Sequence, residues 1–197
     1  MAMTPPSEPG FTSIPNLLSL SRLLATPPLC AAIALEAWGL ALALWAWVSI
    51  TDWLDGALAR AWGQTSALGR VLDPLADKVA VLGTLVCLIP AGMAGGYLAP
   101  WMVAVLVARE FVVTGLRGEM ERLGRPFGAD AFGKVKMVAQ VVAIWMALVL
   151  EWLGKDHRRE WMDLALAASV WIMLAAALAS GMNYGWQAYG KRGRTET

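Results

Sequence analysis

Four aspartates stand close together in a chain that is otherwise apolar. They belong to a pattern of eight residues at fixed spacing, which are Asp52, Asp55, Gly56, Ala59, Arg60, Gly69, Asp73 and Asp77. An acid is costly to place in a bilayer, so acids in an apolar segment indicate a functional site. Carboxylates that lie close together repel each other unless a cation intervenes, and their hard oxygens suit Mg²⁺, Mn²⁺ or Ca²⁺. The pattern therefore predicts a divalent-metal site.

Helical spacing divides this pattern between two helix faces. Its first four residues follow at i, i+3, i+4 and i+7, whereas Gly69, Asp73 and Asp77 follow at i, i+4 and i+8. We expect two antiparallel helices to aim the four carboxylates at one point. Gly56 and Gly69 would leave room for a bulky substrate, or allow close helix packing. Arg60 could neutralise an acid, bind a phosphate or anchor the helix at the interface.

A second group of charged residues lies further along the chain. Arg109 and Glu110 interrupt an apolar run, and Arg117, Lys134 and Lys136 follow. Arginine binds phosphate through two parallel hydrogen bonds and lysine binds it as a point charge. The group favours an anionic, phosphorylated substrate. The alternative is that Arg109 and Glu110 pair with each other and the lysines only set membrane topology.

The composition indicates a membrane protein with several spans. Of 197 residues, 58% are hydrophobic, against about 45–50% in soluble domains. A spanning helix needs about 20 mostly apolar residues. The fold class we expect is all-α integral membrane, with a short interfacial helix near residue 13, or a frayed helix start there. Six spans should follow at residues 17–35, 38–62, 71–89, 97–116, 133–153 and 161–184.

The basic residues predict the orientation of these spans. With six spans, both termini fall on one side, and 13 of the 16 Lys and Arg residues fall there too. Cytoplasmic loops carry the excess of Lys and Arg, so both termini and the acids should be cytoplasmic. We expect residues 1–12 to be a disordered tail, 13–187 the membrane domain and 188–197 a basic tail. Cys30 and Cys87 lie in apolar runs without metal-ligand spacing, which favours small buried residues.

The pattern from Asp52 to Asp77 resembles the signature of the CDP-alcohol phosphotransferase family at every fixed position. The segments IPNLLSLSR, ARE, GLR and GKVK are similar to the branch of that family that uses glycerol 3-phosphate. The resemblance covers about residues 13–187. It implies a six-span homodimer in a bacterial-type inner membrane, multi-pass, with its site open to the cytoplasm. Membrane lipids, and no nucleic acid, would be its partners.

The resemblance also implies roles for individual residues. Asp52, Asp55 and Asp73 would bind two Mg²⁺ or Mn²⁺ ions, and Asp77 would be a metal neighbour and the general base. The residues implied near CDP-diacylglycerol are Asn16, Arg22, Gly56, Ala59, Arg60 and Gly69. Those implied for the acceptor phosphate are Arg109, Arg117, Lys134 and Lys136. The activity implied is transfer of a phosphatidyl group to glycerol 3-phosphate, with release of CMP.

Two other functions remain open at this point. A sister enzyme could use the same metal site with inositol phosphate, phosphatidylglycerol or serine as acceptor. A cation transporter would also carry acids in its spans, although transporters place them near the bilayer midplane on broken helices. Here the acids cluster near the ends of two expected spans, which favours an enzyme.

Overall fold

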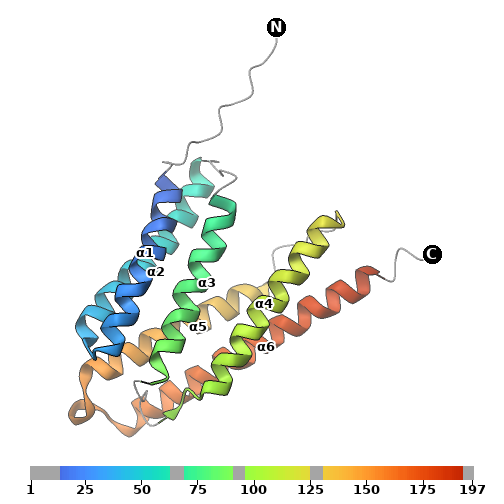
Figure 1. Cartoon of the computed structure of the whole chain (residues 1–197). Coiled ribbons are helices and arrows are strands. Elements are labelled where there is room, and N and C mark those ends of the chain that lie inside the picture. Colours follow the sequence, from blue (N-terminus) through green and yellow to red (C-terminus); the bar gives the residue numbers. More distant parts are fainter. Residues whose placement is uncertain (1–13, 63–68, 91–95, 125–130, 193–197) are drawn as a thin grey trace. The chain divides into compact units, whose positions relative to one another are not determined.

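The computed structural model describes residues 14–62, 69–90, 96–124 and 131–192, and over these residues the chain is helical and has no strand (Figure 1). The all-α prediction is confirmed for this part of the chain. Its helices are α1 (Ile14–Ala34), α2 (Trp38–Trp62), α3 (Gly69–Leu88), α4 (Pro100–Arg122), α5 (Ala131–Leu153), η2 (Lys155–His157) and α6 (Glu160–Arg192). The predicted tail at 1–12 lies outside the described residues.

Each of the six expected spans corresponds to one helix, but several bounds differ. Helix α4 runs to Arg122, past its expected end at 116, and stops where Gly124 adopts a φ of 69°. Such a left-handed residue commonly ends a helix. Helix α6 continues to Arg192, into the segment expected to be a basic tail. The predicted ends were set where the apolar residues stop. In the structure, both helices continue into the polar sequence that follows.

The prediction of a separate short helix before the first span is wrong. Ile14 begins α1 itself, which continues to Ala34 through Pro27 and Pro28. An interfacial helix would leave its polar side chains in water, but Ser19 and Arg22 are each only 1% exposed. These residues are therefore part of the packed helices.

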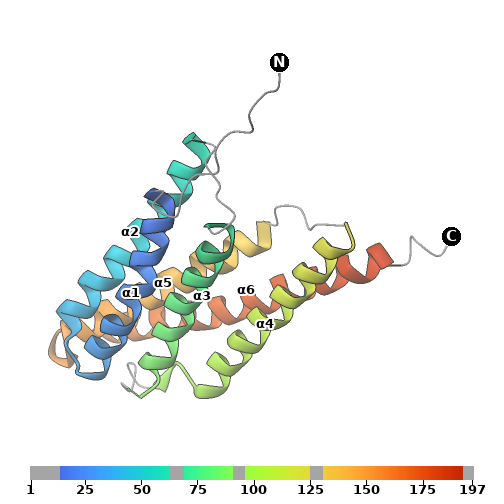
Figure 2. The same ribbon diagram turned by 45° about the horizontal axis from the view of Figure 1, so that its top comes forward.

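The chain forms two compact units, residues 1–84 and residues 85–197. In the first unit, α1 and α2 lie side by side (Figures 1 and 2), and α3 contacts α1 where Gly83 approaches Thr26 and Cys30. Leu29, Ile33 and Trp45 are among its buried apolar side chains. In the second unit, α6 packs against both α4 and α5.

Within the part of the chain that the structure describes, three helices are long and apolar enough to cross a membrane, namely those spanning Asn16–Ala34, Ala131–Leu153 and Glu160–Tyr189. The expectation of six spans stays a prediction.

Helix α1 differs from a helix of a soluble protein, which buries its apolar stripe and exposes its polar face. Its buried residues include Asn16, Ser19, Arg22 and Thr26, whereas Leu17, Leu20 and Leu24 are exposed. Apolar side chains directed outward suit lipid as the surrounding solvent.

Candidate active site

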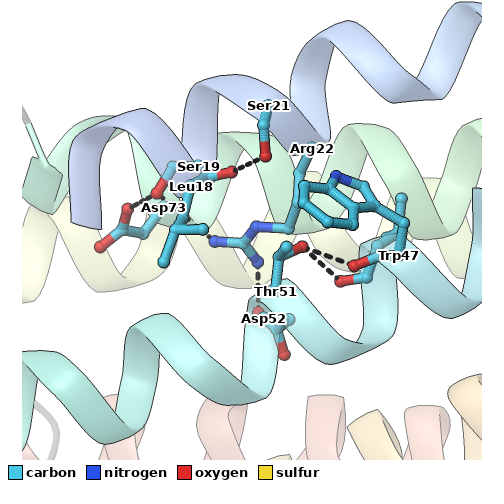
Figure 3. Close-up of polar contacts among 9 residues, drawn as sticks. Leu18, Ser19, Ser21, Arg22, Trp47, Thr51, Asp52 and Asp73 are labelled. Atoms are coloured by element: carbon cyan, nitrogen blue, oxygen red, sulfur yellow. Dashed lines mark hydrogen bonds and ion pairs between the residues drawn. The ribbon is translucent and has the colours of Figure 1, made fainter. Parts of the chain in front are cut away.

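Two residues on one face of α1 bind two of the four aspartates. Arg22 donates from Nη1 to Oδ1 of Asp52 on α2, and Ser19 donates from Oγ to Oδ1 of Asp73 on α3. Arg22 Nη2 lies 3.5 Å from Ser19 Oγ. Figure 3 shows the guanidinium between Asp52 and Ser19, with Asp73 on the far side of Ser19. We call these four residues the α1 tether, because α1 connects the two acids.

The α1 tether is buried at its centre and open at its acids. Ser19 and Arg22 are each 1% exposed, while the side chain of Asp52 is 30% exposed. Asp73 is likewise half-buried. A buried guanidinium needs an anionic partner, since an isolated buried charge is very costly. Asp52 supplies that anion and still reaches solvent, so both acids are accessible to a ligand.

Thr51 and Asp52 are neighbouring polar residues of α2, and they satisfy their polar groups in different ways. Its neighbour Thr51 is satisfied within the helix, because its hydroxyl lies 2.7 Å from the carbonyl oxygen of Trp47 and 3.1 Å from that of Val48 (Figure 3). Threonine commonly satisfies its hydroxyl in this way inside helices. Asp52 has no such local option and pairs with Arg22 of the neighbouring helix.

The remaining residues of the pattern lie on the same two helices. Asp77 follows Asp73 by one turn of α3 and is half-buried, so it shares the face that carries Asp73. The backbone around Asp55 belongs to α2 and that around Gly69 begins α3. The side chains of the other pattern residues lie outside the described part: Asp55, Gly56, Ala59, Arg60 and Gly69.

The donor set fits a hard divalent cation. Among the side chains that the structure describes, no three His, Cys, Asp or Glu residues form a metal-binding group. Two of the four expected ligands, Asp52 and Asp73, are nevertheless connected through α1, each by one oxygen, Oδ1. A carboxylate has a second oxygen, and Mg²⁺ and Mn²⁺ prefer carboxylate and water ligands. Metal binding itself remains a prediction.

The second unit contains a buried cluster of charges around Glu110. Its Oε1 accepts from Arg109 Nη1 at 2.7 Å and from Lys136 Nζ at 2.5 Å. Arg109 also donates from Nε to the carbonyl oxygen of Ala177 at 3.1 Å and from Nη2 to Ser180 Oγ at 2.7 Å. We call Arg109, Glu110, Lys136 and Ser180 the Glu110 cluster. It ties α4 to both α5 and α6.

The other two basic residues expected at an acceptor phosphate are exposed. Lys134 makes no ion pair with any described residue. Arg117 lies over the ring of Tyr184, with 5.3 Å between its guanidinium carbon and the ring centroid. The Tyr184 hydroxyl would lie 3.6 Å from a Cβ added at Gly133. Tyr184 therefore brings α6 close to Arg117 of α4 and to the start of α5.

Several residues in these contacts escaped the sequence reasoning: Ser19, Ser180 and Tyr184 were not singled out. Ser19 could have been found, because it stands one turn before Arg22 on the same face. Ser180 contacts Arg109 across 71 positions of sequence, and Tyr184 on the same helix contacts Arg117 of α4. No local pattern signals contacts between residues so far apart in the chain. In the described part of the chain, Cys30 and Cys87 form no disulfide, and both are half-buried rather than fully buried.

Comparisons with known proteins agree with the resemblance seen in the sequence. The model of the CDP-alcohol phosphatidyltransferase family matches residues 12–181. The CDP-diacylglycerol–glycerol-3-phosphate 3-phosphatidyltransferase of Bacillus subtilis is 36% identical over 71% of this chain and 70% of its own length. The enzyme of the same name from Cereibacter sphaeroides is 34% identical over 86% of this chain and 76% of its own.

A relative with another name is also similar. The cardiolipin synthase (CMP-forming) of Streptomyces coelicolor is 39% identical over 58% of this chain and 54% of its own length. The family match covers both units of the fold, including the α1 tether and the Glu110 cluster. The chain belongs to the CDP-alcohol phosphatidyltransferase family.

Proposed function

We propose that the chain transfers the phosphatidyl group of CDP-diacylglycerol to the primary hydroxyl of glycerol 3-phosphate, giving phosphatidylglycerophosphate and CMP. The observation that carries the chemistry is the α1 tether, which holds two acids of the family pattern on neighbouring helices. Relatives named for this reaction cover more than two thirds of the chain and support the choice of acceptor. The chain is thus a transferase of phospholipid biosynthesis.

The four aspartates have different roles in the proposed reaction. Asp52, Asp55 and Asp73 hold two divalent ions, Mg²⁺ or Mn²⁺, with Asp77 beside them. When bound, such ions neutralise phosphate charge and stabilise the departing CMP. Asp77 accepts the proton of the acceptor hydroxyl, and that oxygen attacks the phosphorus that carries diacylglycerol. The bond from this phosphorus to the CMP oxygen breaks, and CMP leaves.

The nucleotide lipid binds beside these acids in this proposal. Gly56, Ala59 and Gly69 leave space for the CDP group, with Arg60 at its phosphates. Asn16 and Arg22 approach the same group from α1, and both are buried on the face that carries the α1 tether. Arg22 also pairs with Asp52, so this acid and the pyrophosphate would share its positive charge.

The basic residues of the second unit would differ in their roles toward the acceptor phosphate. Lys134 and Arg117 are exposed, which leaves them available to an anion. Lys136 donates one hydrogen bond to Glu110. An ammonium has three N–H donors, so it can also donate to a phosphate. Arg109 instead uses all three of its nitrogens within the protein. We therefore assign the phosphate to Lys134, Lys136 and Arg117, with Arg109 as the residue that supports them.

The proposal extends to membrane and assembly. All six helices α1 to α6 cross the inner membrane of a bacterium, with both termini and the active site at the cytoplasmic side, as the distribution of Lys and Arg predicts. The relatives cited are bacterial enzymes. The active form is a homodimer. The exposed apolar residues of α1 support contact with lipid.

A second acceptor deserves a direct comparison because of the Streptomyces relative. A cardiolipin synthase of the CMP-forming type would make phosphatidylglycerol the competing acceptor. Inositol phosphate and serine are further acceptors for the same metal site. The exposed basic residues Arg117 and Lys134 favour an acceptor with a free phosphate over serine.

Removal of divalent ions tests the metal-dependent part of the proposal. Purified protein with CDP-diacylglycerol and glycerol 3-phosphate should release CMP, EDTA should abolish the release, and added Mg²⁺ or Mn²⁺ should restore it. Undiminished CMP release in EDTA would contradict the scheme.

A further inference from the structure

The hydroxyl of Ser19 has no role in the proposed chemistry so far, although it contacts an expected metal ligand. We propose that Ser19 is a positioning residue for metal binding, which fixes one oxygen of Asp73 and leaves the other for a divalent cation. The inference rests on the proposed function, because it requires Asp73 to bind metal. It assigns to α1 a role in metal affinity separate from contact with the substrate.

The direction of the Ser19 hydroxyl is the first observation behind this role. Hydroxyls on helices of this protein commonly donate to carbonyl oxygens of their own helix. Ser21 donates to Leu18 at 2.7 Å, Thr26 to Arg22 at 2.9 Å and Thr84 to Ala80 at 2.7 Å. The Ser19 hydroxyl differs, because it reaches a carboxylate on another helix, that of Asp73.

The surroundings of Ser19 are the second observation. Its hydroxyl is buried, with 1% of the residue exposed, so water competes little for the contact with Asp73. Arg22 Nη2 lies 3.5 Å from Ser19 Oγ, and its positive charge polarises the Ser19 hydroxyl so that the proton points toward Asp73. Since Arg22 is itself fixed by Asp52, the orientation of one acid is coupled through α1 to the other.

The expected size of the effect follows from how metal sites depend on the partners of their ligands. Carboxylates that ligate a metal are themselves hydrogen-bonded, and loss of such a partner typically lowers affinity about 10–100-fold. Ser19→Ala removes a single oxygen, leaves the helix-forming tendency at least as high and keeps all four acids. It should therefore weaken metal binding without disturbing the fold.

The experiment measures Mn²⁺ binding by the purified full chain in detergent, without any substrate, from the electron paramagnetic resonance signal of free Mn²⁺. Ser19→Ala should bind Mn²⁺ about 10–100-fold more weakly than the wild type. The matched control is Ser21→Ala, two residues along the same helix, whose hydroxyl serves only the local backbone in the contacts described. It should bind Mn²⁺ as the wild type does. Ser19→Thr keeps a hydroxyl and should restore most of the affinity.

Activity supplies a second measurement that a purely structural role would not reproduce. In Ser19→Ala, the Mg²⁺ concentration for half-maximal CMP release should rise by the same factor, whereas kcat at saturating Mg²⁺ should stay close to that of the wild type. Thermal unfolding in EDTA should stay cooperative in Ser19→Ala, with Tm lowered only as far as the loss of one hydrogen bond to a charged group requires.

The outcomes separate this inference from the function beneath it. A wild-type protein that binds no Mn²⁺ would overturn both the proposed metal chemistry and the role of Ser19. Wild-type binding together with unchanged binding in Ser19→Ala would overturn the role of Ser19 alone. Equal weakening in Ser21→Ala, or a well-folded Ser19→Thr that binds no better than Ser19→Ala, would also contradict it.

Discussion

The α1 tether and the Glu110 cluster both bring charges into the packed helices, but they satisfy them differently. In the α1 tether, Asp52 and Asp73 each give one oxygen to α1, and both acids reach solvent. In the Glu110 cluster, each of the three guanidinium nitrogens of Arg109 donates to an acceptor within the protein, and its side chain is only 9% exposed. Acids that reach solvent and keep a second oxygen for a ligand suit ligand binding. Buried charges that bond to neighbouring helices hold those helices together.

The proposed function assigns the reaction to the acids of α2 and α3, and the variant Asp77→Asn is the most severe test of that assignment. A positioned general base typically contributes about 10²–10⁴-fold, so kcat should fall by at least that factor. Continuous measurement of CMP release gives kcat, and circular dichroism checks the fold. Asp156→Asn, in the exposed turn η2, makes the same chemical change and should leave kcat unaltered. Near-wild-type turnover in Asp77→Asn would remove Asp77 as the base.

The opposite expectation applies to Glu110, where the main loss should be stability. Removing one partner of a buried ion pair costs about 3–5 kcal/mol, and Glu110→Gln strips the charge that both Arg109 and Lys136 share. We expect Tm in detergent to fall by several degrees. Glu119→Gln is the control, since Glu119 pairs with Arg122 on the exposed surface of the same helix and such pairs contribute little. Equal Tm values for the two variants would refute the structural role.

Lys134 offers a finer test, because it is exposed on the helix that also carries the half-buried Lys136. A hydrogen bond to a charged group contributes about 1.5–3 kcal/mol, which corresponds to about 10–150-fold in KM for glycerol 3-phosphate. Lys134→Gln should raise that KM and leave Tm unchanged. Lys155→Gln, in the exposed turn η2, is the matched control. An unchanged KM would show that Lys134 does not bind the acceptor.

The smallest expected effect concerns the packing of Arg109 on α6. A Cβ at Gly181 would lie 3.2 Å from Arg109 Cγ, so the arginine must shift by a few tenths of an ångström. At Gly185 on the same helix, a Cβ would meet nothing within 4 Å. Alanine gains up to about 1 kcal/mol over glycine inside a helix. Gly185→Ala should therefore raise Tm slightly, and Gly181→Ala should raise it less or lower it. Equal gains would show that Arg109 packs loosely there.

The positions of the helices, and the helix face on which the aspartates lie, could be predicted from the sequence because both depend on short-range patterns. Apolar runs located all six long helices, with α2 predicted at the observed bounds of Trp38–Trp62. Helical spacing placed Asp73 and Asp77 on one face of α3. Polar sequence at the ends misled the predictions, so that the ends of α4 and α6 and the continuity of α1 were missed.

The partners of these residues could not be predicted in the same way. Arg22 meets Asp52 across 30 positions and Ser19 meets Asp73 across 54, so each contact depends on how the helices pack. Arg22 was expected near the substrate, and its pairing with an acid emerged only from the structure. For Arg109 and Glu110, the simpler of two readings, that they pair, is the contact observed.

One measurement tests the central claim, which is the identity of the reaction. Purified protein is given CDP-diacylglycerol, Mg²⁺ and one acceptor at a time: glycerol 3-phosphate, phosphatidylglycerol, inositol phosphate or serine. CMP release and the lipid product are measured for each. We expect the highest kcat/KM with glycerol 3-phosphate, and phosphatidylglycerophosphate as the product. Preference for another acceptor would contradict the proposed substrate while keeping the family chemistry, and no CMP release with any acceptor would contradict the proposed reaction.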